Sequence, residues 1–253
     1  MRRQRTALVV VALALLLLAV PAAADWNERV QKAARLLQDG QPEKSLRITR
    51  RLTVEMVEGL GSGEDSRRAL ATVLALRAAA EAATGREDDA RFHWSFATSY
   101  SYRRDLEHVS LEPYGEGGRI LEQWRTGAAE RERQAEGPQQ AQETAPVAAA
   151  EGEGLEEIEP PRRLETVPPQ YTRVARQQNF QGVVILQATI DRTGKVGEIQ
   201  ILRSAQPGLD YRAAESLRAT PFAPALRNGE PVDVYYNSTI NFSIDHPSRP
   251  GIP

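Results

Sequence analysis

One stretch of the chain, residues 182–204, constrains the fold more than any other. It reads GVVILQATIDRTGKVGEIQILRS, two runs rich in β-branched and apolar residues around the polar break at residues 191–194. A glycine that closes a short polar loop adopts a positive φ without steric penalty, so the pattern predicts a β-hairpin. A lone hairpin is marginal in water, so it needs a third strand and a helix to cover it.

The residues that follow the hairpin provide both. Asp210 has the chemistry of a helix N-cap, and residues 211–217 carry one or two helical turns. Asn228-Gly229 predicts a turn. From Val232 to Ile244 apolar and polar residues alternate, which is typical of a half-buried strand.

The return arm of the hairpin contains one irregularity. Ile199 and Ile201 share a face while Val196 is out of step with them, and this predicts a bulge near Gly197. With a short helix over residues 171–178, the order of elements predicts a three-stranded antiparallel sheet with two helices on one face. The upstream part is predicted to be all-α helical hairpins, so the fold class of the whole chain is α+β.

Residues 25–129 show the helical period. Trp26, Val30, Ala33 and Leu37 fall at i, i+4, i+7 and i+11, and glycines at 40, 61, 63 and 85 separate the predicted helices. Small residues at 45 and 90 each follow a helix-ending glycine by five positions, which resembles the helix-turn-helix unit of tetratricopeptide repeats. A plain antiparallel helical bundle is the alternative. A further helix is expected at residues 118–129.

Residues 130–166 have the composition of a linker. Seven Glu and no Lys or Arg lie between positions 136 and 159, with Pro, Gln, Ala and Gly between them. Such a segment buries too little apolar surface to offset its conformational entropy, so we predict a disordered acidic linker.

Residues 1–24 resemble an export signal. Three Arg precede an apolar run at residues 7–20, and the small residues that follow predict cleavage between Ala24 and Asp25. The alternative is an uncleaved anchor in the inner membrane, although the run is shorter than the roughly 20 residues of a spanning helix. In either case the remaining chain is expected outside the cytoplasm.

The composition argues against several classes of function. The net charge of -2 argues against nucleic acid as a partner. The chain has no Cys, and His93, His108 and His246 lack metal-ligand spacing, so neither a metal nor another cofactor is expected. No nucleophile–base constellation is present, and we predict that the protein is not an enzyme. Asp88 and Asp89 are expected on a solvated surface.

A string of Tyr, Gly, Pro and small residues in fixed order runs through residues 167–246. Its members are Tyr171, Ala175, Gly182, Gly194, Ser204, Asp210, Pro221, Phe222, Pro224 and Gly229. This segment resembles the C-terminal domain of the TonB family of energy transducers. Residues 247–253 form a tail beyond it.

The resemblance implies a periplasmic domain that engages outer-membrane transporters. The domain of this family pairs the edge of its sheet with an extended segment of the transporter, the TonB box. The last strand is the best candidate edge, with the binding residues Val232, Asp233, Val234, Tyr235, Tyr236, Asn237 and Thr239.

Two functions follow from the resemblance. The first is binding of a transporter or another envelope protein, with energy coupling if the N-terminal segment stays in the inner membrane. Family members that contact a proton motor use His and Ser in their anchor, and residues 7–20 contain neither. The second is a periplasmic scaffold whose domain serves self-association as a homodimer.

Overall fold

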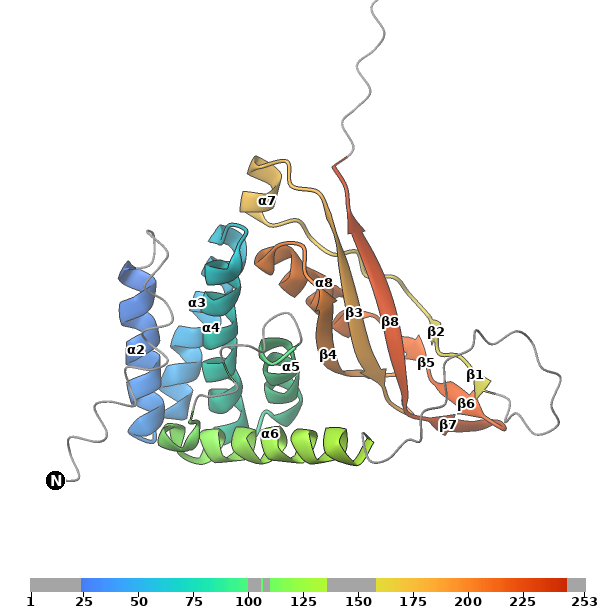
Figure 1. Ribbon diagram of the computed structural model, residues 1–253, viewed down its shortest axis with the longest axis horizontal. Coiled ribbons are helices and arrows are strands. Elements are labelled where there is room, and N and C mark those ends of the chain that lie inside the picture. Colours follow the sequence, from blue (N-terminus) through green and yellow to red (C-terminus); the bar gives the residue numbers. More distant parts are fainter. Residues whose placement is uncertain (1–23, 100–105, 107–109, 136–157, 245–253) are drawn as a thin grey trace, which may run out of the picture.

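The computed structural model describes residues 24–99, 106, 110–135 and 158–244 (Figure 1). Its N-terminal part is helical, and we call residues 24–135 the helical unit. The elements are α2 (Ala24–Gln38), α3 (Pro42–Gly59), α4 (Glu64–Ala83), α5 (Glu87–Ala97), the 3-10 turn η2 (Glu112–Tyr114) and α6 (Gly115–Ala135). The helical prediction is confirmed, and α6 extends beyond the predicted range of 118–129. The likeness to tetratricopeptide repeats stays a prediction.

Helix α4 is the centre of the helical unit. It is dense in Ala and Leu, and most of its residues are buried. Small side chains allow neighbouring helices to approach closely. A Cβ on Gly117 of α6 would lie 1.9 Å from the carbonyl oxygen of Ala79. The alanines therefore explain how α3, α5 and α6 all pack against one helix.

The C-terminal part is built around an antiparallel sheet, and we call residues 158–244 the sheet unit. Its main elements are α7 (Arg173–Gln177), β3 (Gly182–Ile190), β4 (Val196–Arg203), α8 (Pro207–Ala219) and β8 (Val234–Phe242). The strand order is β4-β3-β8, with β3 in the middle. The inward side chains of β3 are fully buried while the outward ones are half-buried. The α+β class and the three-stranded sheet are confirmed.

The hairpin forms as its sequence predicts. Ala188 pairs with Ile199 and Ile190 with Val196, so two residues of β4 lie opposite one of β3 at the predicted bulge. Gly194 has a φ of 82° in the turn. The Asp191 carboxylate accepts hydrogen bonds from the Thr193 N–H at 2.8 Å and the Lys195 N–H at 3.0 Å.

Helix α8 begins earlier than predicted. Asp210 is not its N-cap: the helix starts at Pro207, and Gln206 occupies the N-cap position. Proline is favoured at the first helical position because its φ is already helical. An N–H at that position would have no acceptor within the helix, so proline loses no hydrogen bond there. Asp210 instead lies in the first turn, where its carboxylate accepts hydrogen bonds from the Ser204 hydroxyl at 2.5 Å and the Ala205 N–H at 2.9 Å.

The prediction that residues 130–166 form a disordered linker is wrong at both ends. Helix α6 reaches Ala135, and residues 158–163 contain β1 (Ile158–Glu159) and β2 (Arg162–Arg163). These strands pair with β6 (Ala225–Arg227) and β5 (Phe222–Ala223), and β6 pairs with β7 (Glu230–Val232). Their partner strands lie 59 to 69 positions away in the sequence, so local composition does not reveal the pairing. Residues 136–157 lie outside the described part.

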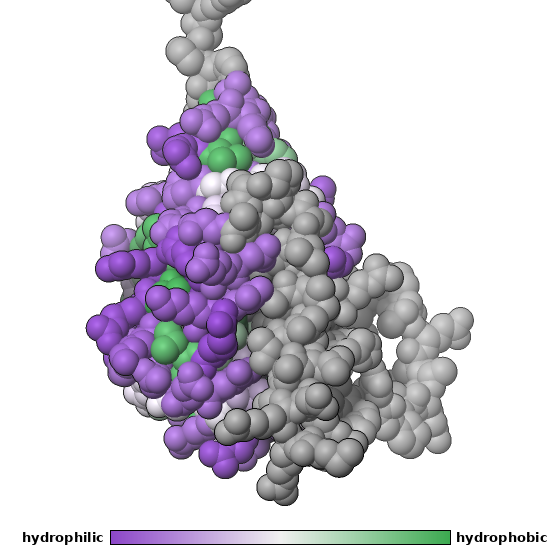
Figure 2. All heavy atoms as spheres, turned by 90° about the vertical axis from the view of Figure 1, so that its left-hand side faces the viewer, coloured by the Kyte–Doolittle hydropathy of each residue, from purple (hydrophilic) through white to green (hydrophobic). Residues whose placement is uncertain are grey.

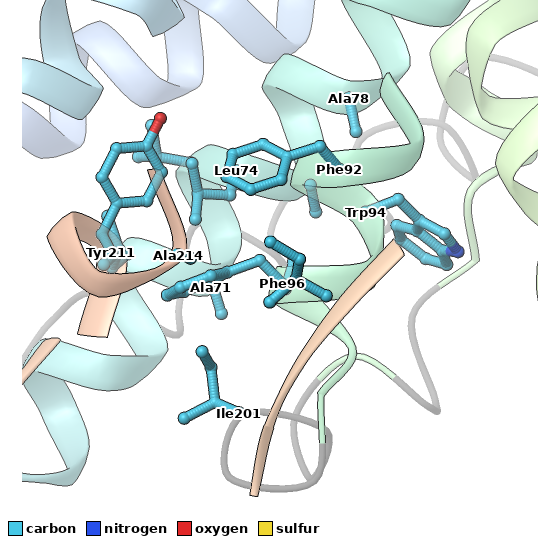
Figure 3. Packing of buried hydrophobic residues seen from close by; sticks show 14 of the residues in the cluster. Ala71, Leu74, Ala78, Phe92, Trp94, Phe96, Ile201, Tyr211 and Ala214 are labelled. Atoms are coloured by element: carbon cyan, nitrogen blue, oxygen red, sulfur yellow. The ribbon is translucent and has the colours of Figure 1, made fainter. Parts of the chain in front are cut away.

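The two units share one hydrophobic core. Buried side chains of α3, α4, α5, α8, β3 and β4 form a single cluster, and α8 lies between the helices and the sheet (Figure 1). Figure 3 shows this junction: Phe92 and Phe96 of α5 lie near Leu74 of α4, Tyr211 of α8 and Ile201 of β4. The opposite side of the helical unit is mostly hydrophilic, with separate apolar spots (Figure 2).

Several predictions fall on residues outside the described part. These are the apolar run of the export signal, His108, His246 and the tail at residues 247–253. Ala24 opens α2, and Asp25 lies in its first turn. Within the described residues, every helix is too short or too polar to cross a membrane.

Candidate protein-binding edge

Strand β8 lies at an edge of the sheet. Its nine residues pair with β3 in unbroken register, from Val234 opposite Ile190 to Phe242 opposite Gly182. Within the described part of the chain, no strand pairs with the other side of β8. An open edge of this kind presents unpaired N–H and C=O groups to an extended segment.

The pairing of β4 decides which residues of β8 present those groups. In an antiparallel pair, successive residues direct their backbone groups alternately toward the partner strand and away from it. The N–H of Ile199 on β4 donates to Ser95 rather than to β3, so its register partner Ala188 directs its backbone groups toward Tyr236 of β8. By the same alternation, the residues that face the open edge are Tyr235, Asn237, Thr239 and Asn241.

The side chains of these edge residues lie on the outer face of the sheet. Tyr235 is 76% exposed, the largest exposed fraction among the described large apolar side chains. The Asn237 side chain accepts a hydrogen bond from the Gln187 amide at 3.3 Å, which links β8 to β3 on this face. A strand added to β8 would therefore meet an exposed aromatic ring and a row of polar side chains.

The inner face of β8 is held by residues from distant strands. Arg163 of β2 donates to the Ser238 hydroxyl at 2.7 Å, and its guanidinium lies 5.5 Å from the centre of the Tyr236 ring. Phe222 of β5 packs edge-on against the same ring at 5.1 Å. These contacts fix the inner side of the edge strand while its outer backbone stays open.

The predicted binding residues do not all lie on one strand. Val232 ends β7 opposite Ala225, and Asp233 lies between β7 and β8, where its carboxylate accepts a hydrogen bond from the Arg192 N–H at 3.0 Å. The other five predicted residues lie on β8: Val234, Tyr235, Tyr236, Asn237 and Thr239. Their role in binding stays a prediction.

The motif residues occupy structural positions around the sheet. Tyr171 packs edge-on against Phe242 with ring centres 5.3 Å apart, and Ala175 is fully buried in α7. A Cβ on Gly182 would lie 2.9 Å from Ala205. The Ser204 hydroxyl donates a hydrogen bond to the Asp210 carboxylate. Phe222 is the first residue of β5, Pro221 and Pro224 flank that strand, and Gly229 lies in the β6–β7 turn with a φ of 83°.

The other edge of the sheet, along β4, is covered by the helical unit. The buried Ser95 hydroxyl of α5 accepts the hydrogen bond from the Ile199 N–H at 3.0 Å. Arg91 of α5 lies 3.5 Å from the Glu198 carboxylate, and Asp88 pairs with Lys195. The expectation that Asp88 and Asp89 are merely solvated is wrong for Asp89, whose carboxylate accepts from Arg218 of α8 at 2.6 Å.

A closed ring of polar side chains is buried where the units meet. Arg77 and Glu81 of α4 pair at 2.9 Å, Glu81 contacts Nδ1 of His93 at 2.6 Å, and Nε2 of His93 lies 3.1 Å from the Tyr211 hydroxyl. Arg77 donates to the same hydroxyl at 3.4 Å and closes the ring. A cleft of about 390 Å³ borders it.

The protonation states of the ring follow from its environment. Burial lowers the pKa of His93, an effect that outweighs the hydrogen bond to Glu81. Neutral His93 with its proton on Nδ1 donates to Glu81 and accepts from Tyr211, so each group has a partner. Burial also raises the pKa of Tyr211, which keeps its hydroxyl as a donor.

Sequence reasoning missed this junction and Arg163. One signal was available for the ring: Glu81 interrupts a run of Ala and Leu in a predicted helix, and a charged side chain at a buried position needs a partner. No comparable signal marks Ser95 or Arg163. Among the described residues, no cluster of His, Asp and Glu could hold a metal ion.

The chain is similar to known proteins over its C-terminal part. Residues 167–244 match the family described as Gram-negative bacterial TonB protein C-terminal. Protein TonB of Vibrio cholerae serotype O1 is 29% identical over 108 residues, which are 41% of this chain and 44% of that protein. The match therefore spans less than half of that relative. The solution NMR structure of the Pseudomonas aeruginosa TonB CTD is 25% identical and covers 34% of this chain and 88% of that one, with a TM-score of 0.31.

Proposed function

We propose that the protein binds an outer-membrane transporter in the periplasm, on the premise that residues 167–244, which match the TonB C-terminal family, form a domain of that kind. The binding element is strand β8, which takes up an extended segment of the transporter as a fourth strand. The open edge of β8 is the observation that carries this proposal. Main-chain hydrogen bonds supply affinity in this mode of recognition, and alternate side chains supply specificity.

The surroundings of β8 suit this role. Its unbroken register with β3 keeps the outward backbone groups evenly spaced, as an incoming strand requires. Arg163, Tyr236 and Phe222 support the inner face, so the edge is ordered before a partner arrives. Preorganisation reduces the entropy that binding must offset.

The periplasmic location rests on the sequence. The apolar run of residues 7–20 and the small-residue site before Asp25 are typical of an export signal. The similarity to a protein named TonB supports the same compartment. We infer a soluble adaptor if the signal is cleaved, with α2 near the start of the mature chain.

An uncleaved N-terminal segment would favour a second function, energy transduction from the inner membrane. The mass of the protein purified from its own envelope fractions separates the two functions. A mass that begins at Asp25 in the soluble periplasm supports the adaptor. A full-length mass in the inner membrane supports the energy transducer.

Binding through the β8 edge can be tested with Thr239→Pro. We expect this variant to bind a fluorescent peptide from the N-terminal plug segment of an outer-membrane transporter at least about tenfold more weakly. The dissociation constant is measured by fluorescence anisotropy. Proline removes an N–H that faces the open edge and leaves the pairing with β3 in place. The assay uses the full mature chain.

The matched control is Thr239→Ala, which removes the side chain and keeps the backbone N–H. We expect it to bind the peptide nearly as well as the unmodified protein. Circular dichroism must show that both variants are folded. Undiminished binding by folded Thr239→Pro would refute the β8 model.

A further inference from the structure

The sheet has a second edge, along β4, and the helical unit lies on it. Uncovered strand edges pair with other strands, and proteins prevent this by covering the edge with a helix or loop. Here the N–H of Ile199 donates a hydrogen bond to the hydroxyl of Ser95, so a helix side chain takes the place of a neighbouring strand. We propose that the helical unit is a built-in cap that closes the β4 edge and leaves the β4-β3-β8 sheet, within the described residues, with one edge for partners.

Close packing holds the cap against the sheet unit. Gly208 at the start of α8 lies against α3, and a Cβ there would be 2.3 Å from the carbonyl oxygen of Val57. The side-chain amide of Gln206 donates to the carbonyl of Leu60 at 3.1 Å. Phe92 and Phe96 bury their rings near Tyr211, with ring centres 6.2 and 5.6 Å from it (Figure 3). The contact is therefore tight at both α3 and α5.

Polar pairs fix the orientation of the cap. The Glu58 carboxylate accepts from Arg212 at 2.7 Å and from the N–H of Arg173 at 2.8 Å. Arg218 pairs with Asp89 at 2.6 Å. The ring of Arg77, Glu81, His93 and Tyr211 is satisfied only while α8 lies against α4 and α5. Buried polar networks that are fully satisfied favour one arrangement, because a shifted one leaves groups unpaired.

The cap has a consequence for the proposed function and extends it. With β4 closed, a transporter segment can join the sheet only at β8, so one chain binds one segment. The cap also prevents two copies from joining through β4. A chain whose cap is released should therefore associate through the exposed β4 edge, with a second copy of itself as the partner.

The cap can be tested by charge reversal at the junction. The variants are Asp89→Arg, Arg218→Asp and the double reversal, each made in the Thr239→Pro background so that β8 cannot pair. We expect the single reversals to form dimers by light scattering at high protein concentration, and the double reversal to stay monomeric. Monomeric single reversals whose junction is opened, as judged by limited proteolysis, would overturn the proposal.

Exchange of backbone amides in the unmodified protein tests the cap without a mutation. We expect the Ile199 amide to exchange at least about tenfold more slowly than the open-edge amides of Asn237 and Thr239. Equal exchange at the two edges would show that β4 is uncovered. Because neither readout involves a transporter peptide, failure of the cap is distinguishable from failure of binding at β8.

Discussion

Gly194 is the residue that allows the hairpin to meet the rest of the sheet unit. Its φ is 82°, its carbonyl accepts the Phe222 N–H at 3.2 Å, and a Cβ would lie 1.9 Å from the Phe222 carbonyl oxygen. Two constraints therefore act on one position, a backbone conformation that favours glycine and a contact with backbone atoms that cannot move independently.

We expect Gly194→Ala to lower the free energy of unfolding by about 3 kcal/mol, from strained backbone plus steric overlap. Gly229 provides a matched control because its φ is 83° and, among the described residues beyond its chain neighbours, nothing lies within 4 Å of a Cβ built there. Gly229→Ala should lose only about 1 kcal/mol, from the backbone strain alone. Urea denaturation measures both; equal losses would mean that the contact with Phe222 is unimportant.

At the scale of elements, β2 shows how a segment far from the sheet in sequence positions the edge strand. Strand β2 pairs with the short strand β5 in a two-stranded sheet, yet its Arg163 reaches the inner face of β8. The side chain bonds Ser238 and lies over Tyr236, two successive inward residues of β8. Strand β2 thus stabilises the inner face of the candidate binding edge through Arg163.

Arg163→Ala should destabilise the protein by about 1 kcal/mol, because a hydrogen bond and a cation–π contact at a largely exposed side chain are lost. The looser edge should also bind the transporter peptide more weakly. Arg162→Ala is the control, since Arg162 precedes Arg163 on the same strand and is exposed. Thermal melts measure the loss of stability, and fluorescence anisotropy measures peptide binding. Identical behaviour of the two variants would argue against a role of Arg163 in supporting β8.

At the scale of the whole molecule, the two units form one body with a continuous core. The ring at their junction makes its stability depend on pH. The charged and titratable groups that face His93 come from three helices: Arg77, Glu81, Asp89, Tyr211, Glu215 and Arg218. Burial lowers the pKa of His93 below its ordinary value of 6.5.

Below pH about 6.5 the unfolded chain protonates this histidine while the folded protein keeps it neutral. The unfolded state then binds more protons, so the free energy of unfolding falls as the pH falls from 6.5 toward the lower folded-state pKa. We expect His93→Gln to be less stable overall but to have a flatter pH dependence in this window. Urea denaturation across pH measures this, and parallel curves for the two proteins would remove His93 as the cause.

Most helices and strands could be predicted from local sequence patterns. Polar breaks with glycine predicted the hairpin and the turn at Asn228-Gly229, alternation predicted the face of β8, and helical periodicity predicted α2 to α5. These signals are local: they depend on side-chain period and on the conformations that glycine and proline favour. The candidate edge strand was predictable for the same reason, apart from the break at Asp233.

How the helices and strands pack together could not be predicted in this way. Ser95 and Ile199 are 104 positions apart, and His93 and Tyr211 are 118 apart. Their contacts result from packing α5 against β4 and α8, which buries apolar surface without a preferred local sequence pattern. The same packing shows which edge of the sheet is closed, and hence which backbone groups of β8 face outward. The open edge is a property of the assembled molecule, because each strand becomes central or peripheral only when its neighbours are in place.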